Sequence, residues 1–113
     1  MEDAEMSTQL LNGKIKSAKF QRCVEFGGLE LTLEIEGKGW GTIVSSPAFT
    51  YYTREEDLKV NSEAVANFHR LLEFFNVRTV EDLVNKIVTC EFSEYNTFKR
   101  FRDILDNDII FEW

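Results

Sequence analysis

Apolar and polar residues alternate most regularly between residues 29 and 36. Leucine or isoleucine occupies every second position there, and glutamate or threonine fills the positions between. A period of two is typical of a strand with one buried and one exposed face. The exposed face carries Glu30, Glu34 and Glu36 and is therefore acidic. This strand is followed by a tryptophan between glycines, Trp40.

Two further strands are predicted beside this one. Apolar positions indicate a first strand over residues 14–23, and Gly27-Gly28 is a turn signal. The glycine-rich turn at residues 37–39 leads into a third strand over residues 40–45. Short turns between strands predict an antiparallel meander. Pro47 ends the third strand, because proline has no N–H to donate to a ladder.

Residues 47–60 are predicted to form a loop or an irregular segment. Tyr51 and Tyr52 lie in it, followed by the charged run at residues 54–57. Long loops that carry aromatic residues often serve binding. The segment is therefore a candidate interaction surface.

A helical period of apolar residues predicts a helix over residues 63–75. Asn61 or Ser62 can cap its first turn, because both side chains accept a hydrogen bond from a backbone N–H. Asn76 is its expected end, since asparagine tolerates the left-handed conformation. A second short helix is predicted to begin at Thr79, where an acidic first turn suits the helix dipole.

The C-terminal segment predicts a strand over residues 86–92, then a short helix or a bent strand over residues 98–105. The apolar residues 109–113 are expected to be tied into the core. The fold class predicted is α+β: a mostly antiparallel sheet, with an N-terminal meander of about three strands and later strands from the C-terminal half, packed with two helices. Residues 1–9 are expected to be a flexible N-terminus, and residues 10–113 a single α+β domain.

Composition narrows the class of protein. The chain has 113 residues, 43% of them hydrophobic and ten of them phenylalanine, which is enough for the core of one domain. No apolar run approaches the roughly 18 residues of a membrane span. The first residues are acidic and polar, unlike a secretion signal, so we expect a cytoplasmic protein. Cys23 and Cys90 are then expected to be reduced core thiols and not a disulfide.

The formal net charge of −7 bears on partners. A negative field repels nucleic acid, so direct DNA or RNA binding is not expected. The same field attracts basic protein surfaces. Ordinary solubility is the alternative explanation, and the charge by itself favours it.

No catalytic or metal-binding motif is visible in the sequence. A lone His69 offers no Ser-His-Asp triad. Residues 37–42 lack the order of a phosphate-binding loop, and Asp106-Asn107-Asp108 lacks the remaining ligands of a calcium loop. We therefore expect no enzyme, no cofactor and no metal.

Glu34 and Glu36 allow one more interpretation. They lie two positions apart on one strand face, about 6–7 Å from each other. This spacing approximates that of successive phosphates in a nucleic-acid strand, so the pair can mimic DNA toward a basic partner. A simply solvated strand face is the alternative.

Five short motifs occur in an order that resembles a family of small proteins encoded by bacteriophages and prophages. The resemblance spans residues 15–113, and Thr42-Ile43 departs from the family's usual Gly-Tyr. The motifs are Leu31-Thr32-Leu33, Gly37-Lys38-Gly39-Trp40-Gly41, Leu71-Leu72-Glu73-Phe74-Phe75-Asn76-Val77, Glu81-Asp82-Leu83, and Ile104-Leu105 with residues 109–113.

The resemblance implies a phage accessory protein in the host bacterial cytoplasm that is not an enzyme. Small acidic phage proteins often block host defence, so the leading hypothesis is an anti-CRISPR protein: an inhibitor that binds a CRISPR-Cas or other defence complex stoichiometrically. Its partner would be a protein or ribonucleoprotein complex with a basic surface, met by acids and anchored by aromatics. The candidate contact residues are Glu30, Glu34, Glu36, Trp40, Tyr51, Tyr52, Glu55, Glu56 and Asp57.

Other functions stay open. A sequestering protein that binds a small nucleotide signal would need converging basic groups such as Lys14, Lys16, Lys38 or Arg54. A hydrolase with a carboxylate-bound metal is a third hypothesis, and a non-enzymatic phage accessory protein of another role is a fourth. The oligomeric state does not follow from the sequence.

Overall fold

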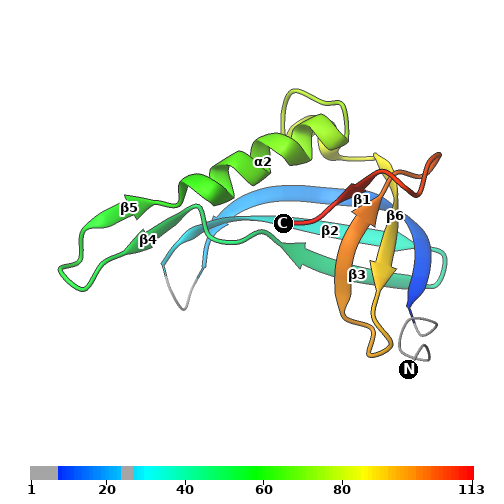
Figure 1. Ribbon diagram of the computed structural model, residues 1–113, viewed down its shortest axis with the longest axis horizontal. Coiled ribbons are helices and arrows are strands. Elements are labelled where there is room, and N and C mark those ends of the chain that lie inside the picture. The colour runs from blue at the N-terminus through cyan, green and yellow to red at the C-terminus, as the bar shows by residue number, and fades with distance from the viewer. Residues whose placement is uncertain (1–7, 24–26) are drawn as a thin grey trace.

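An antiparallel sheet of six strands, in the order β3-β2-β1-β6-β7-β8, forms the main layer of the protein (Figure 1). The computed structural model describes residues 8–23 and 27–113. Most of the predicted flexible N-terminus, residues 1–7, lies outside the described residues, and Gln9 already belongs to a strand. The six strands are β1 (Gln9–Arg22), β2 (Leu29–Gly37), β3 (Trp40–Ser45), β6 (Ile87–Phe92), β7 (Phe98–Arg102) and β8 (Ile110–Phe111).

The long strand β1 joins two halves of this sheet. Its C-terminal part, residues 14–22, pairs with β2, and its N-terminal part, residues 9–14, pairs with β6. A bulge at Lys16, close to the boundary between the two parts, shifts the β1–β2 register. Bulges bend a strand and increase its twist. The two halves of the sheet consequently meet near Lys14 at one curved strand (Figure 1).

The inner face of the sheet carries the core. In β2 the alternating residues Leu31, Leu33 and Ile35 are fully buried, as the period of two predicts. The helix α2 (Ser62–Phe74) covers this face and contributes Leu71, which is also fully buried. From the other half of the sheet, β7 adds Phe101, whose ring lies 5.7 Å from that of Phe75. One apolar cluster therefore holds both halves together.

The predicted class, α+β with two helices, is wrong. Within the described residues the protein is mostly antiparallel sheet with a single α-helix. That helix, α2, has the expected cap, since Asn61 Oδ1 accepts from the Ala64 N–H at 3.2 Å, and Asn76 beyond its end has a φ of 55°. Where the second helix was expected, only the 3₁₀ turn η1 (Glu81–Leu83) forms. This turn does not continue into a longer helix, because the Asn85 N–H donates to the Ile15 carbonyl of β1 at 2.7 Å.

Two further segments differ from the sequence prediction. Residues 47–60 are not an irregular loop: they contain a hairpin of β4 (Thr50–Tyr52) and β5 (Leu58–Val60), which forms a separate two-stranded sheet. Residues 98–102 form the strand β7 where a short helix was the alternative. The C-terminus is tied down as expected, because Phe111 in β8 is buried and packs against Trp113.

The two cysteines are free, as predicted. Cys90 is fully buried in the core, and this burial raises the pKa of its thiol to about 12. A thiol with so high a pKa is a poor nucleophile at neutral pH, because the thiolate is the reactive form. Cys23 is only half-buried, so the prediction of two core thiols holds for Cys90 alone.

The glycine-rich segment after β2 forms a tight hairpin. Gly37 pairs with Trp40 across a two-residue turn, in which Gly39 has a φ of +81°. The indole of Trp40 folds back over Gly37 and Gly13, where a side chain would collide with it. These two glycines thus provide the space that Trp40 occupies.

We expect the substitution Gly37→Ala to lower the free energy of unfolding by about 2 kcal/mol, because overfilling a packed site forces its neighbours to shift. A Cβ at residue 37 would meet the Trp40 indole and lie 2.7 Å from the backbone oxygen of Asn12. Urea unfolding measures the effect. Gly41→Ala is the matched control, since a Cβ there makes only an ordinary contact at 3.5 Å. Equal stability of the two variants would contradict this account of the packing.

Candidate functional site

The nine predicted contact residues fall on two separate surfaces. One is the β4–β5 hairpin, which carries Tyr51 and Tyr52 in β4 and the acids of residues 55–57 in its turn. The other is the β2–β3 edge of the main sheet, with Glu30, Glu34, Glu36 and Trp40. Figure 1 shows the hairpin extending beyond the main sheet, in line with α2. Only the first group is brought together on one exposed, projecting element.

The base of the hairpin is held firmly to the body of the protein. Phe49, which precedes β4, is buried, and its ring lies 5.7 Å from that of Phe68 in α2. Its N–H donates to the Leu29 carbonyl at 2.7 Å, and its own carbonyl accepts from the Asn61 N–H at 2.7 Å. An isolated two-stranded hairpin is marginally stable in water. These anchors fix where the hairpin starts.

The side chains of the hairpin lie largely in solvent. Tyr52 is 54% exposed and faces Leu58 across the two strands, while Tyr51 faces Lys59 on the opposite side. Leu58 and Val60 are more exposed still. Scattered apolar residues on a surface are normal, but Tyr52, Leu58 and Val60 share one face of this projecting hairpin and form a patch typical of interaction sites. Tyrosine is enriched among the residues that dominate binding energy.

The turn of the hairpin adds charge to this patch. Its backbone is fixed by Thr53, which accepts the N–H of Glu56 at 2.9 Å on its carbonyl and that of Asp57 at 3.2 Å on its hydroxyl. The acids Glu55, Glu56 and Asp57 are exposed and form no ion pair among the described residues. Three carboxylates against the cations Arg54 and Lys59 leave one net negative charge. The hairpin therefore presents tyrosines beside an acidic tip.

The face of β2 is less acidic than its own sequence suggests. Register places Lys14 opposite Glu36 and Lys19 opposite Thr32 on the adjacent strand β1. Lys16, at the bulge, has its Nζ 3.7 Å from Glu36 and 4.0 Å from Glu34. Lysines of β1 thus balance the glutamates of β2 in number. The outward face of β2 is acidic, as predicted, but lysines of β1 share this face of the sheet, and the sequence alone could not place them there.

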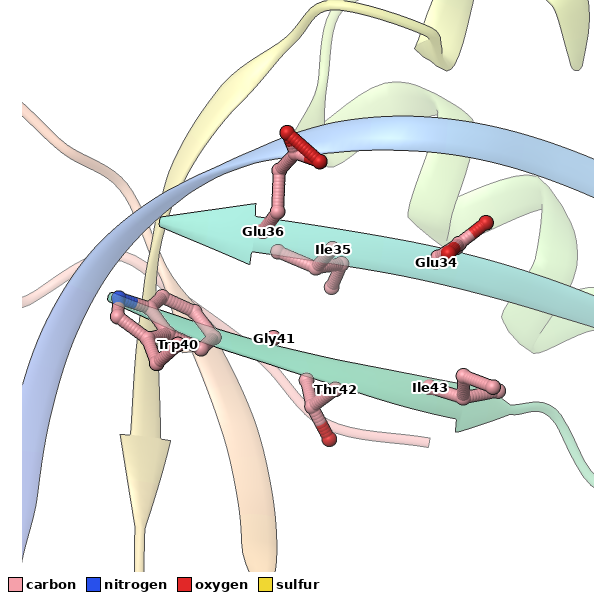
Figure 2. Close-up of a pocket in the computed structure, with 7 residues that line it drawn as sticks. All are labelled: Glu34, Ile35, Glu36, Trp40, Gly41, Thr42 and Ile43. Atoms are coloured by element: carbon pink, nitrogen blue, oxygen red, sulfur yellow. The ribbon is translucent and has the colours of Figure 1, made fainter. Parts of the chain in front are cut away.

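Trp40 is half-buried and serves the packing of the sheet. Its ring lies edge-on to Phe92 of β6, with centroids 5.7 Å apart. The sheet curls enough to bring the start of β3 against the end of β6. Part of the indole still lines a surface groove with Glu34, Glu36 and Ile43, drawn in Figure 2.

Other candidate groups do not assemble into a site. His69 is exposed on α2, 3.5 Å from Glu73 one turn on. The carboxylates of Asp103 and Asp106 accept backbone N–H groups of their own loop. In the part of the chain that the structure describes, no three His, Cys, Asp or Glu side chains are placed to hold a metal ion. No described helix is long and apolar enough to span a membrane.

The basic groups proposed for a nucleotide site do not converge. Lys16 is engaged with the glutamates of β2. Lys38 lies in the β2–β3 turn, while Arg54 lies in the turn of the β4–β5 hairpin at the opposite end of the molecule (Figure 1). No observation therefore favours the nucleotide hypothesis.

A buried ion cluster on β6 and β7 was missed by the sequence analysis. The side chain of Glu91 is only 6% exposed, and each of its oxygens receives an arginine: Arg100 Nη1 at 2.8 Å and Arg102 Nε at 2.6 Å. Arg100 also reaches Glu112 at 3.3 Å, and Arg102 donates to the Asn107 carbonyl at 2.6 Å. The charged residues Glu91, Arg100 and Arg102 are visible in the sequence, but their pairing depends on the register of the two strands.

This cluster makes stability depend on pH. Burial alone would raise the pKa of Glu91, but hydrogen bonds and charges from Arg102 and Arg100 outweigh it, so the pKa lies below the ordinary 4.5. A carboxyl group whose pKa is lower in the folded state stabilises the fold at any pH above its unfolded-state pKa. That stabilisation is lost as the pH falls through the folded-state pKa. We expect the free energy of unfolding to drop as pH falls below about 4.5. Urea titrations should show a smaller drop in Glu91→Gln, and an equal drop would contradict this assignment.

Comparison of the chain with protein-family models, with curated proteins and with solved structures finds no match.

Proposed function

We propose that this chain is a phage or mobile-element accessory protein that inhibits a bacterial defence complex, of the CRISPR-Cas kind, by stoichiometric binding. Its partner carries a basic surface that ordinarily meets nucleic acid. The resemblance to small phage proteins supports an accessory role, and the net charge of −7 supports a basic partner. The protein acts by occupying that surface in the host cytoplasm, without chemistry of its own.

The observation that carries this proposal is the β4–β5 hairpin. It is anchored at its base by Phe49 and exposes Tyr51 and Tyr52 beside an acidic turn. Tyrosine provides a large contact area with few rotatable bonds, so little conformational entropy is lost on binding. Acidic groups around the tyrosines favour a basic partner and speed its encounter.

A pull-down from bacterial lysate tests the proposal. The tagged protein is the bait, the double variant Tyr51→Ala/Tyr52→Ala is the matched control, and mass spectrometry identifies what is bound. We expect a CRISPR-Cas or other defence complex at a near-stoichiometric ratio with the natural protein only. Recovery of no defence protein, or equal recovery by the double variant, would contradict the proposal.

An interference assay separates binding from inhibition. Cells with an active CRISPR-Cas system that targets a plasmid are transformed with and without the protein. Inhibition predicts that the targeted plasmid survives, and that the double tyrosine variant does not protect it. Plasmid loss at the same rate in all strains would reject inhibition of that system.

A further inference from the structure

We propose that the free edge of β3 accepts an added β-strand from another protein: an extended segment with a lysine or arginine on one face and an apolar side chain on the other. The edge is separate from the β4–β5 hairpin, so this inference does not rest on the proposed function. Addition of a strand to a sheet edge is an established mode of peptide recognition, in which backbone hydrogen bonds give affinity and side-chain pockets give specificity.

The register of the sheet shows which backbone groups are free. The Ser46 N–H donates to the Leu31 carbonyl at 2.8 Å, and the same register continues through β3 and β2. Because hydrogen-bonded and outward-facing residues alternate in an antiparallel pair, Gly41, Ile43 and Ser45 direct their N–H and C=O groups away from β2. No described strand pairs with them.

This edge lacks the protection that natural sheets use against unwanted pairing. Charged residues, proline and very short length are the usual devices. The other edge strand, β8, has only two residues and is followed by Glu112. By contrast, residues 40–45 contain six residues without a charge or a proline, and Ile43 is 67% exposed. An unprotected edge of this kind is suited to a partner strand.

A groove on one face of the edge fits a basic side chain. Its lining includes the carboxylates of Glu34 and Glu36, together with Ile43, and no basic residue (Figure 2). A strand added to β3 would lie about 10 Å from β2, two strand spacings away. Gly41 has no side chain to block the way, so a long lysine or arginine beside it can reach the carboxylates. Lys16 of β1 contacts both carboxylates, at 3.7 Å and 4.0 Å, but it does not line the groove.

A second hollow on the opposite face of the edge fits an apolar side chain. Leu11, Trp40 and Phe92 supply the apolar part of its lining, which also includes Gln9 and Asn96. Its volume is about 310 Å³. Successive side chains of an added strand point to opposite faces, so one strand can fill both hollows at once. The alternation of basic and apolar residues follows from this pair of hollows.

A second copy of this chain is a poorer occupant. Its own β3, with the sequence Trp-Gly-Thr-Ile-Val-Ser, provides no basic side chain for the acidic groove. Self-pairing is therefore an alternative outcome that the experiment must be able to detect.

The experiment titrates the isotope-labelled protein with a synthetic peptide of alternating lysine and valine residues, and with a control peptide of alternating glutamate and valine. We expect the lysine peptide to bind about tenfold more tightly or better, given the two carboxylates. It should slow amide exchange at Gly41, Ile43 and Ser45. Equal affinity for both peptides, or protection elsewhere on the sheet, would overturn the proposal. Protection of these amides that rises with protein concentration alone would assign the edge to a second copy.

Two variants make the test specific. The double variant Glu34→Gln/Glu36→Gln keeps side-chain size and should lose most of the preference for the lysine peptide. Ile43→Pro removes one outward N–H and should lower the affinity for both peptides. Proline is tolerated at edge positions whose N–H faces solvent. If Ile43→Pro does not fold, the glutamine variant alone decides: an unchanged preference for lysine would reject the acidic groove.

Discussion

Replacing Glu91 by glutamine is expected to lower the free energy of unfolding by about 3 kcal/mol, because removing one partner of a buried ion pair leaves its counter-charge uncompensated. Glu91 binds two arginines, with distances of 2.8 Å to Arg100 and 2.6 Å to Arg102. Both guanidinium groups lie mostly out of water. Glutamine has nearly the same shape, so the change tests the charge and not the packing. Urea unfolding at neutral pH measures it.

Glu112→Gln is the matched control for this prediction. Glu112 also pairs with Arg100, at 3.3 Å, but its side chain is about half exposed. Exposed ion pairs contribute about 0–1 kcal/mol, so the control should cost far less than Glu91→Gln. Similar losses in the two variants would mean that burial does not decide the strength of this cluster.

The second large effect concerns binding. We expect Tyr52→Ala to weaken the complex with the proposed partner by about 30- to 1,000-fold, or about 2–4 kcal/mol, as is typical of a residue that dominates an interface. Stability should change little, because Tyr52 is largely in solvent. Calorimetric titration against the purified defence complex gives the affinity, and a thermal melt confirms folding.

Tyr95→Ala controls for the loss of an exposed tyrosine. Tyr95 lies in the turn between β6 and β7 and is the most exposed tyrosine of the described chain. Its replacement should leave affinity unchanged. Comparison of Tyr52→Ala with Tyr51→Ala shows which face of the hairpin contacts the partner, because the two tyrosines lie on opposite faces. Equal affinity of all three variants and the natural protein would exclude the hairpin from the interface.

The elements with a clear internal period were predictable from the sequence. The strand expected over residues 29–36 is observed as Leu29–Gly37, and the third strand is observed at residues 40–45 as expected. The helix expected over residues 63–75 is observed as Ser62–Phe74. In the first of these strands and in the helix an apolar face repeats along the chain, so local spacing identifies the element. The third strand follows from the glycine-rich turn before it and from Pro47 after it.

Features that depend on contacts between distant segments were not predictable. The apolar residues after Thr79 resemble a helix, but Leu83 is buried in the core and Asn85 bonds to β1, which ends the turn. The bulge at Lys16 decides which charges on β1 lie beside the glutamates of β2. The tyrosines and acids of residues 51–57 were recognised as candidates, but not that β5 would pair with β4 and present them on a hairpin.

The division of β1 between two partners also has a consequence for the order of folding. The hairpins β1–β2, β2–β3 and β6–β7 join strands that are neighbours in sequence. The β1–β6 pairing instead joins residues 77 positions apart, such as Thr89, whose hydroxyl donates to Asn12 Oδ1 at 2.7 Å. Closing so long a loop costs chain entropy before any contact compensates it, and such non-local pairings slow folding. We expect the β1–β6 ladder to form last. Until it does, the backbone N–H and C=O groups of residues 9–14 have no β6 partner. During synthesis this part of the sheet therefore stays incomplete until the C-terminal half has been made.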